Sequence, residues 1–225
     1  MDNDLFNDLA INFPMNNEIR DKLYRYFSVD KLEHALFYKW KYGLRFELNN
    51  GGSYVEMFTS SYARARELLE HTFKSSEELY ILLRFYDYPS DKDKQKIPKQ
   101  MRRLKRCGFQ LPEQHLVEKS SHIRFAGEED ECEEWHYEYL LLTEINSSNY
   151  LAILWAICSN ELGIQPSAGV KGYFIDFQKQ IIAHPYDDRG MDIVAIEKDA
   201  IAFLYQDYSS WLLDYDLARM SKTLE

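Results

Sequence analysis

The sequence lacks the features of several large protein classes. Its three cysteines share no C-x-x-C spacing, so we expect neither a disulfide framework nor a zinc ribbon. The longest apolar segment, YLAILWAIC at 150–158, is far shorter than the roughly 20 residues that a membrane-spanning helix needs. The first ten residues, MDNDLFNDLA, carry acids where a secretory signal peptide carries Lys or Arg. We therefore expect a protein with no membrane segment that stays in the cytoplasm.

The common catalytic and cofactor-binding motifs are also missing. The sequence contains no G-x-S-x-G, no Walker-type phosphate loop, no H-E-x-x-H and no G-x-G-x-x-G. Its six histidines are scattered and do not have the spacing of metal ligands. We expect no catalytic residue, no bound metal and no cofactor, and a non-enzymatic protein is the leading hypothesis.

Basic residues are outnumbered, with 27 Lys and Arg against 37 Asp and Glu and a net charge of −10. We therefore do not expect nucleic acid to be the main partner, because its phosphates bind to basic surfaces. The acidic balance favours a basic protein partner instead. Two segments depart from the average: residues 92–106 hold eight basic residues, and residues 128–134 hold six acids. The basic segment either binds RNA or forms a solvated helix face that pairs with the acidic one.

What the sequence does contain is enough apolar material for a core. Apolar residues make up 45% of the 225 residues, and aromatic residues reach 15%. Periodic apolar positions predict helices over 16–27, 53–73, 99–107, 146–163 and 198–220, the last as one long helix or two. Alternation and β-rich composition predict strands over 44–48, 78–88, 134–145, 172–177, 180–186 and 191–195. Residues 108–133 are expected to be irregular, apart from a short strand around 123–125.

These elements predict an α+β protein. We expect a single domain with a mixed, mainly antiparallel sheet, packed helices and a long C-terminal helix. The predicted boundaries are an N-terminal helical segment at 1–34 and the α+β domain at 35–220. Asn or Ser before residue 147 is available as a helix N-cap, and Gly163 as the stop.

The C-terminal third resembles a known family through two motifs. The first is Tyr-Asp-Asp-Arg-Gly-x-Asp, and the second is Tyr-x-x-Trp-x-x-x-Tyr-Asp. They fall here on Tyr186, Asp187, Asp188, Arg189, Gly190 and Asp192, and on Tyr208, Trp211, Tyr215 and Asp216. With FYKWKYGLRFEL and NELGIQPS, the chain resembles the bacterial family catalogued as domain of unknown function 3885 over about residues 35–217. The resemblance implies no catalytic residue; it does imply proteins encoded beside polymorphic toxins, where small acidic proteins serve as immunity partners.

The YDDRG run at 186–190 has three interpretations. The favoured one is a tight turn between two strands, in which Asp side chains bond to nearby amides and Gly190 supplies a positive φ. In the second, an exposed Asp-Asp-Arg loop contacts a cationic partner. In the third, Asp187, Asp188 and Asp192, with His184, hold a metal ion for a phosphoester or nucleotide reaction.

The leading hypothesis is a bacterial immunity protein that binds and masks a basic toxin domain. The alternatives are a metal-dependent phosphoester enzyme and RNA binding through 92–106. Tyr186 and Gly190 are assigned to the turn. The candidate partner contacts are Asp187, Asp188, Arg189, Asp192, Glu128, Glu129, Asp130 and Glu131.

Overall fold

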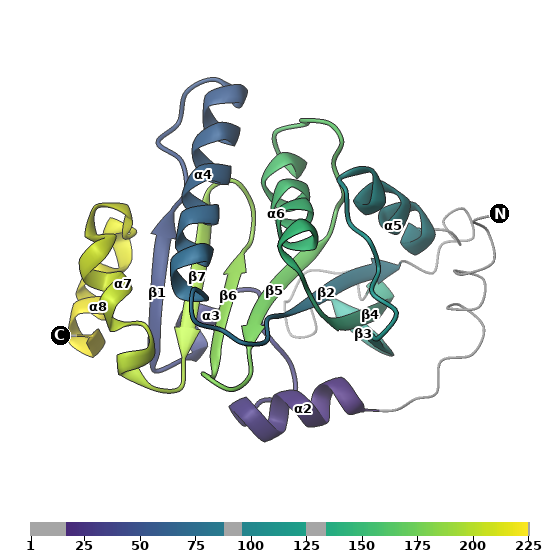
Figure 1. The fold of residues 1–225 in the computed structure, drawn as a ribbon, viewed down its shortest axis with the longest axis horizontal. Helices are drawn as coiled ribbons and strands as arrows, with labels where there is room; N and C mark the ends of the chain where they lie inside the picture. Colours follow the sequence, from purple (N-terminus) through teal and green to yellow (C-terminus); the bar gives the residue numbers. More distant parts are fainter. Residues whose placement is uncertain (1–16, 88–95, 125–133, 225) are drawn as a thin grey trace.

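The computed structural model describes residues 17–87, 96–124 and 134–224. In this part of the chain, one seven-stranded sheet forms the centre of the molecule, with the order β1-β7-β6-β5-β2-β4-β3 (Figure 1). All of its described strand pairs are antiparallel, which confirms the predicted α+β class. The strands are β1 Tyr42–Glu47, β2 Tyr80–Asp87, β3 Leu116–Arg124, β4 Glu134–Glu144, β5 Lys171–Asp176, β6 Ile181–Pro185 and β7 Gly190–Ala195.

Seven α-helices lie within the described ranges. They are α2 Glu18–Phe27, α3 Leu36–Lys39, α4 Tyr54–Thr72, α5 Lys96–Arg106, α6 Ser147–Asn160, α7 Ala202–Asp207 and α8 Leu217–Leu224. None of the described helices is both long and apolar enough to span a bilayer. The predicted helices at 16–27, 53–73, 99–107 and 146–163 are confirmed as α2, α4, α5 and α6.

Two of these helices begin where local chemistry requires. Ser53 caps α4 through a capping box, in which its hydroxyl accepts from the Glu56 amide and the Glu56 carboxylate accepts from the Ser53 amide. Asn146 caps α6 by accepting from the Asn149 amide at 2.9 Å. The chain leaves α6 through Gly163, which has the left-handed φ of +67°.

Both faces of the sheet are covered. Helices α4 and α6 lie over one face, with α5 beside them (Figure 1), and their apolar side chains form the larger core. On the opposite face Ile19, Leu23 and Phe27 of α2 pack against strand residues such as Leu82 and Ile182 and form a second core. A sheet with two covered faces must bury the side chains of both.

The structure contains a longer strand than the short one expected around residues 123–125. Residues 108–133 are not irregular throughout, because β3 pairs with β4 along nine residues. β3 is the last strand of the sheet, and its sequence LVEKSSHIR is mostly polar. The strand forms through backbone hydrogen bonds to β4, which any residue except proline can make. It therefore needs no alternation of apolar residues, and the sequence shows none.

The helix predicted over 198–220 is present but divided. Helices α7 and α8 are separated by three-residue 3-10 turns at Ser209–Trp211 and Asp214–Asp216. Between these turns the chain extends and pairs with the edge of the sheet. The Leu213 amide donates to the Arg45 carbonyl at 2.9 Å, and Leu212 forms a bridge with Phe46. This segment therefore covers the edge of β1, which would otherwise present unpaired backbone groups.

Candidate functional site

The YDDRG run closes the hairpin between β6 and β7. The Arg189 amide donates to Asp187 Oδ1 at 2.8 Å, and Arg189 Nε donates to Asp187 Oδ2 at 2.9 Å. The Tyr186 amide donates to the Gly190 carbonyl at 3.2 Å. Asp187 thus bonds to the backbone two residues ahead, as Asp does in tight turns. This geometry agrees with the turn interpretation.

The expectation of an exposed Asp-Asp-Arg loop is wrong for the two acids. Asp187 and Asp188 are 7% and 4% exposed, whereas the Arg189 side chain is 77% exposed. Asn49, which follows β1, holds Asp188 by donating its Nδ2 to the Asp188 carbonyl and to Oδ2 at 2.7 and 3.0 Å. The run lies against the end of β1, so burial leaves Arg189 as its accessible charge.

The expected positive φ of Gly190 is also wrong. Positive φ values occur at Gly51, Gly52, Gly108 and Gly163 among the described glycines, and Gly190 is not one of them. The residue is glycine for a different reason. A methyl group at this position would overlap the side chain of Tyr186, whose Cε2 would lie 2.9 Å away. The Tyr186 ring therefore packs directly on the Gly190 backbone.

We expect Gly190→Ala to lower the free energy of unfolding by about 1–3 kcal/mol, the usual cost of an added methyl group in a packed interior. The half-buried Tyr186 ring has to move to admit the methyl group. Chemical denaturation checks this, with Gly169→Ala as the matched control. An added Cβ at Gly169 would lie 3.8 Å from its nearest neighbour, an ordinary contact. Equal stability of the two variants would contradict the packing argument.

Asp192 lies on the second core face, within an ion pair formed across two strands. Strand pairing places Arg45 of β1 opposite Asp192 of β7. Arg45 Nε donates to Asp192 Oδ1 at 2.9 Å, and the Phe37 amide donates to Oδ2 at 3.1 Å. Asp192 is fully buried, so it has no surface to offer a partner protein in this structure.

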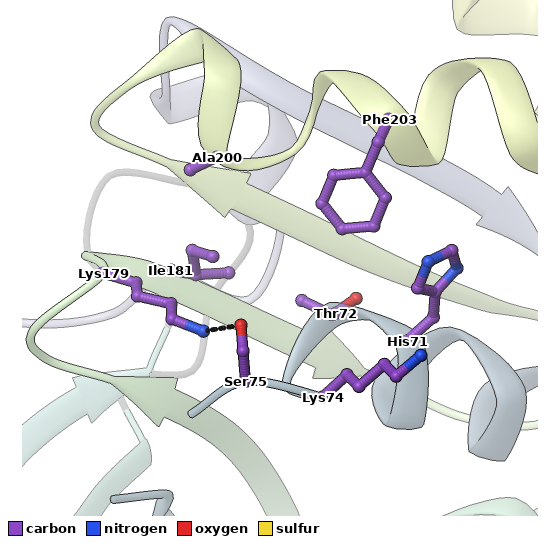
Figure 2. Close-up of a pocket in the computed structure, with 8 residues that line it drawn as sticks. All are labelled: His71, Thr72, Lys74, Ser75, Lys179, Ile181, Ala200 and Phe203. Carbon is purple, nitrogen blue, oxygen red and sulfur yellow. Dashed lines mark hydrogen bonds between the residues drawn. The ribbon is translucent and has the colours of Figure 1, made fainter. Parts of the chain in front are cut away.

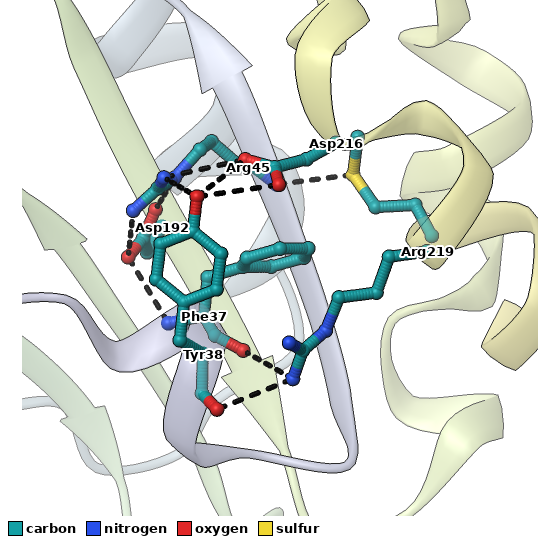
Figure 3. Close-up of polar contacts among 7 residues, drawn as sticks. Phe37, Tyr38, Arg45, Asp192, Asp216 and Arg219 are labelled. Atoms are coloured by element: carbon teal, nitrogen blue, oxygen red, sulfur yellow. Dashed lines mark hydrogen bonds and ion pairs between the residues drawn. The ribbon is translucent and has the colours of Figure 1, made fainter.

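The same arginine reaches the C-terminal segment. Arg45 Nη1 donates to Tyr38 Oη at 2.9 Å and lies 3.3 Å from Asp216 Oδ2, while the Tyr38 hydroxyl donates to Asp216 at 3.2 Å (Figure 3). Tyr38, Arg45, Asp192 and Asp216 are called the Arg45 cluster below. Its two carboxylates come from the two motifs that carry the family resemblance, and they meet on an arginine from β1. The cluster joins the sheet, α3 and the C-terminal segment.

Arg219 encloses the cluster from the α8 side. It donates to the Tyr38 carbonyl at 3.2 Å, and its Cζ lies 5.5 Å from the centre of the Tyr38 ring (Figure 3). Arg45 Cζ lies 4.6 Å from the same ring. Tyr38 is therefore held by two guanidinium groups, in contacts of the cation–π type.

Burial and pairing act in opposite directions on the charges of the cluster. Burial disfavours the charged form of Arg45, but the bond and charge of Asp192 outweigh it and raise the pKa of the guanidinium. Burial raises the pKa of Asp192, and the bonds from Arg45 and the Phe37 amide act against that rise. Each charge is stable in this site because the other is present.

His184 continues the polar row on this face of the sheet, opposite Asp192. Its Nδ1 lies 2.8 Å from the Gly172 carbonyl and so carries the proton, and its ring stacks on Tyr173 with centres 4.1 Å apart. Nε2 is buried and has no hydrogen-bond partner among the described residues. Burial lowers the pKa of His184 to about 3, so the ring is neutral near pH 7.

The three acids of the metal hypothesis do not converge. Asp187 bonds to Arg189, Asp188 to Asn49 and Asp192 to Arg45, and each pairing uses the oxygens that a cation would need. No group of three or more potential metal-ligating side chains occurs in the described ranges. His184 is on the sheet face with Asp192, beside Tyr173.

The charged segments are described in part. α5 buries Met101 and Leu104 and exposes Arg102, Arg103 and Arg106, which confirms a helix with a basic outer face. Glu128, Glu129, Asp130 and Glu131 lie outside the described residues, as does most of the acidic run with which this face is expected to pair.

Together these features define a protein with one antiparallel sheet covered on both faces and a C-terminal segment tied to it by a buried ion pair. A model of the family described as domain of unknown function (DUF3885) matches residues 19–216. The chain belongs to this family, which confirms the resemblance and extends it to α2. Neither the curated proteins nor the solved structures gave a match to this chain.

Proposed function

We propose that this protein acts by binding another protein, with Tyr38 and Tyr215 at the contact. The observation that carries the proposal is the exposure of these rings: 42% for Tyr38 and 83% for Tyr215. Large aromatic side chains exposed to this degree are candidates for binding, because Tyr, Trp and Arg dominate interface energies. Tyr215 directly precedes Asp216, whose carboxylate accepts a hydrogen bond from the Tyr38 hydroxyl. The two tyrosines are therefore neighbours on the surface.

The Arg45 cluster makes this surface rigid before binding. Tyr38 is bonded through its hydroxyl to Arg45 and Asp216, and its backbone carbonyl accepts from Arg219. An aromatic side chain that is already ordered loses little conformational freedom when a partner covers it. The buried ion pairs thus support binding indirectly, by fixing the position of Tyr38.

The net charge favours a basic partner. At −10 the protein attracts a positively charged surface over distance and speeds encounter, while the rings supply apolar contact area. The specific form of the proposal is a bacterial, cytoplasmic immunity protein that masks a basic toxin domain. The acidic charge and the exposed tyrosines support this form. Exposed Arg189 is then a candidate contact outside the centre.

Affinity capture from the native host with a matched pair of double variants tests the proposal. We expect wild type to retain one near-stoichiometric protein that Tyr38→Ala/Tyr215→Ala loses. Truncation of a central interface tyrosine typically costs about 2 kcal/mol or more. Tyr24→Ala/Tyr54→Ala is the control, because Tyr24 and Tyr54 are 66% and 67% exposed on other helices.

The measurement has two outcomes that contradict the proposal. One is wild type that retains no protein in near-stoichiometric amount. The other is a partner that both double variants retain equally, which would place the contact elsewhere. Tyr215→Ala alone adds a variant whose removed ring is largely in solvent, so loss of binding by this variant cannot be assigned to unfolding.

A further inference from the structure

A hollow of about 650 Å³ lies on the side of the molecule where α4 ends, between the turn after β5 and the start of the C-terminal segment (Figure 2). Its size is within the usual range for small-molecule sites. The residues that line it are His71, Thr72, Lys74, Ser75, Lys179, Ile181, Ala200 and Phe203. None of these belongs to the Arg45 cluster or to the tyrosine surface.

One wall of the hollow is aromatic and apolar. The rings of Phe203 and His71 are in contact, with centres 4.9 Å apart, and Figure 2 shows the Phe203 ring directed into the hollow above Thr72. Ile181 and Ala200 extend the apolar surface. A flat ring could stack on Phe203 and displace water from this wall.

Two of the polar groups of the hollow are ammonium groups, in a protein with a net charge of −10. Lys179 Nζ donates to Ser75 Oγ at 2.6 Å, which leaves the Ser75 hydroxyl hydrogen beside the ammonium group as a second donor (Figure 2). Lys74 supplies a second ammonium group on the side nearer His71 (Figure 2), and it takes part in none of the ion pairs found among the described residues. One acidic group lies beside this lining: Asp207 Oδ2 is 4.0 Å from His71 Nε2.

The lysines are not needed to complete the end of α4. Backbone amides already bond to the carbonyls at this end. The Phe73 amide donates to the Leu69 carbonyl, the Lys74 amide to that of His71, and the Ser76 amide to that of Phe73. Asp176, the buried acid nearby, is held by the Ser76 hydroxyl and the Lys179 amide. The ammonium groups of Lys74 and Lys179 are therefore available to a ligand.

We propose that this hollow binds a small phosphate monoester that carries a planar ring, the chemistry of a nucleoside monophosphate. The phosphate lies at Lys179 and Ser75, where an ammonium and a hydroxyl donate side by side, and the ring stacks on Phe203. A phosphate fits this arrangement because its three terminal oxygens can accept from Ser75, Lys179 and the long side chain of Lys74 together. This ligand site is independent of the protein-binding proposal.

Isothermal titration with adenosine 5′-monophosphate tests the site on the full chain. We expect saturable binding that Lys179→Met weakens about tenfold or more, since a hydrogen bond to a charged group is lost. Lys74→Met should weaken it less, and Phe203→Ala should also weaken it. The control is Lys222→Met, which removes an exposed lysine on α8 and should leave the affinity unchanged.

Two further probes separate the phosphate from the ring. Adenosine and inorganic phosphate should each bind more weakly than the monophosphate, because each lacks one of the two contacts. The proposal is overturned if no saturable binding occurs up to about 1 mM monophosphate. It is also overturned if adenosine binds equally well, or if Lys179→Met and Lys222→Met behave alike. Because these variants leave Tyr38 and Tyr215 intact, failure here does not affect the capture experiment.

Discussion

Arg45→Met is expected to lower the free energy of unfolding by about 3–5 kcal/mol near pH 7. Methionine keeps much of the length of the side chain but removes the charge that compensates two buried carboxylates, those of Asp192 and Asp216. Asp192 has no exposed surface, so water cannot replace the lost guanidinium. Chemical denaturation of both proteins measures the difference.

Arg66→Met is the matched control for this experiment. Arg66 Nε lies 2.7 Å from Glu70 Oε1, closer than Arg45 Nε lies to Asp192, but both partners are about half exposed. Exposed pairs contribute about 0–1 kcal/mol, so burial and not distance should decide the outcome. Arg45→Met/Asp192→Asn should be less destabilised than Arg45→Met, because it removes one uncompensated charge. A loss below about 1 kcal/mol for Arg45→Met would contradict this account.

Much of the fold could be predicted because its signals are local. The capping residues Ser53 and Asn146 stand a few positions from the amides they bond, and the apolar spacing behind them marks α4 and α6. The short strands β5, β6 and β7 are apolar and separated by turn residues. The length of β3 and the place where the C-terminal helix divides depend instead on pairing with distant strands, which leaves no periodic pattern in the sequence.

The Arg45 cluster could not be predicted for the same reason. Arg45 alternates with Leu44 and Phe46, so the pattern assigns it to a solvent-facing side together with Glu47. Glu47 is exposed as expected, but α3 and the C-terminal segment cover Arg45. Its partners Asp192 and Asp216 are 147 and 171 residues away. The alternation of apolar and polar residues in β1 does not show that α3 and the C-terminal segment cover its polar side.

The second large effect is on stability at low pH. We expect His184→Asn to change the pH dependence of the free energy of unfolding. Asparagine can keep a donor to the Gly172 carbonyl, but it cannot take up a proton between about pH 3 and pH 6.5. The folded protein resists protonation of His184 until about pH 3, whereas the unfolded chain takes up the proton near the ordinary pKa of 6.5. Through this residue, the free energy of unfolding of wild type therefore falls by about 1.4 kcal/mol per pH unit as the pH is lowered through that interval.

Above the ordinary pKa the imidazole is neutral in both states, so the variant differs from wild type there only through lost contacts such as the stacking on Tyr173. Between about pH 7.5 and about pH 5.0 this difference should shrink by about 2 kcal/mol, since only wild type carries the acid penalty. His115→Asn is the control, because His115 also places Nδ1 on a backbone carbonyl, at 2.9 Å, but is partly exposed. The difference from wild type should shrink more for His184→Asn than for this control, because the acid penalty comes from the complete burial of His184. A constant difference for His184→Asn would show that folded His184 takes up its proton near the ordinary pKa of 6.5, against its complete burial and its bare Nε2.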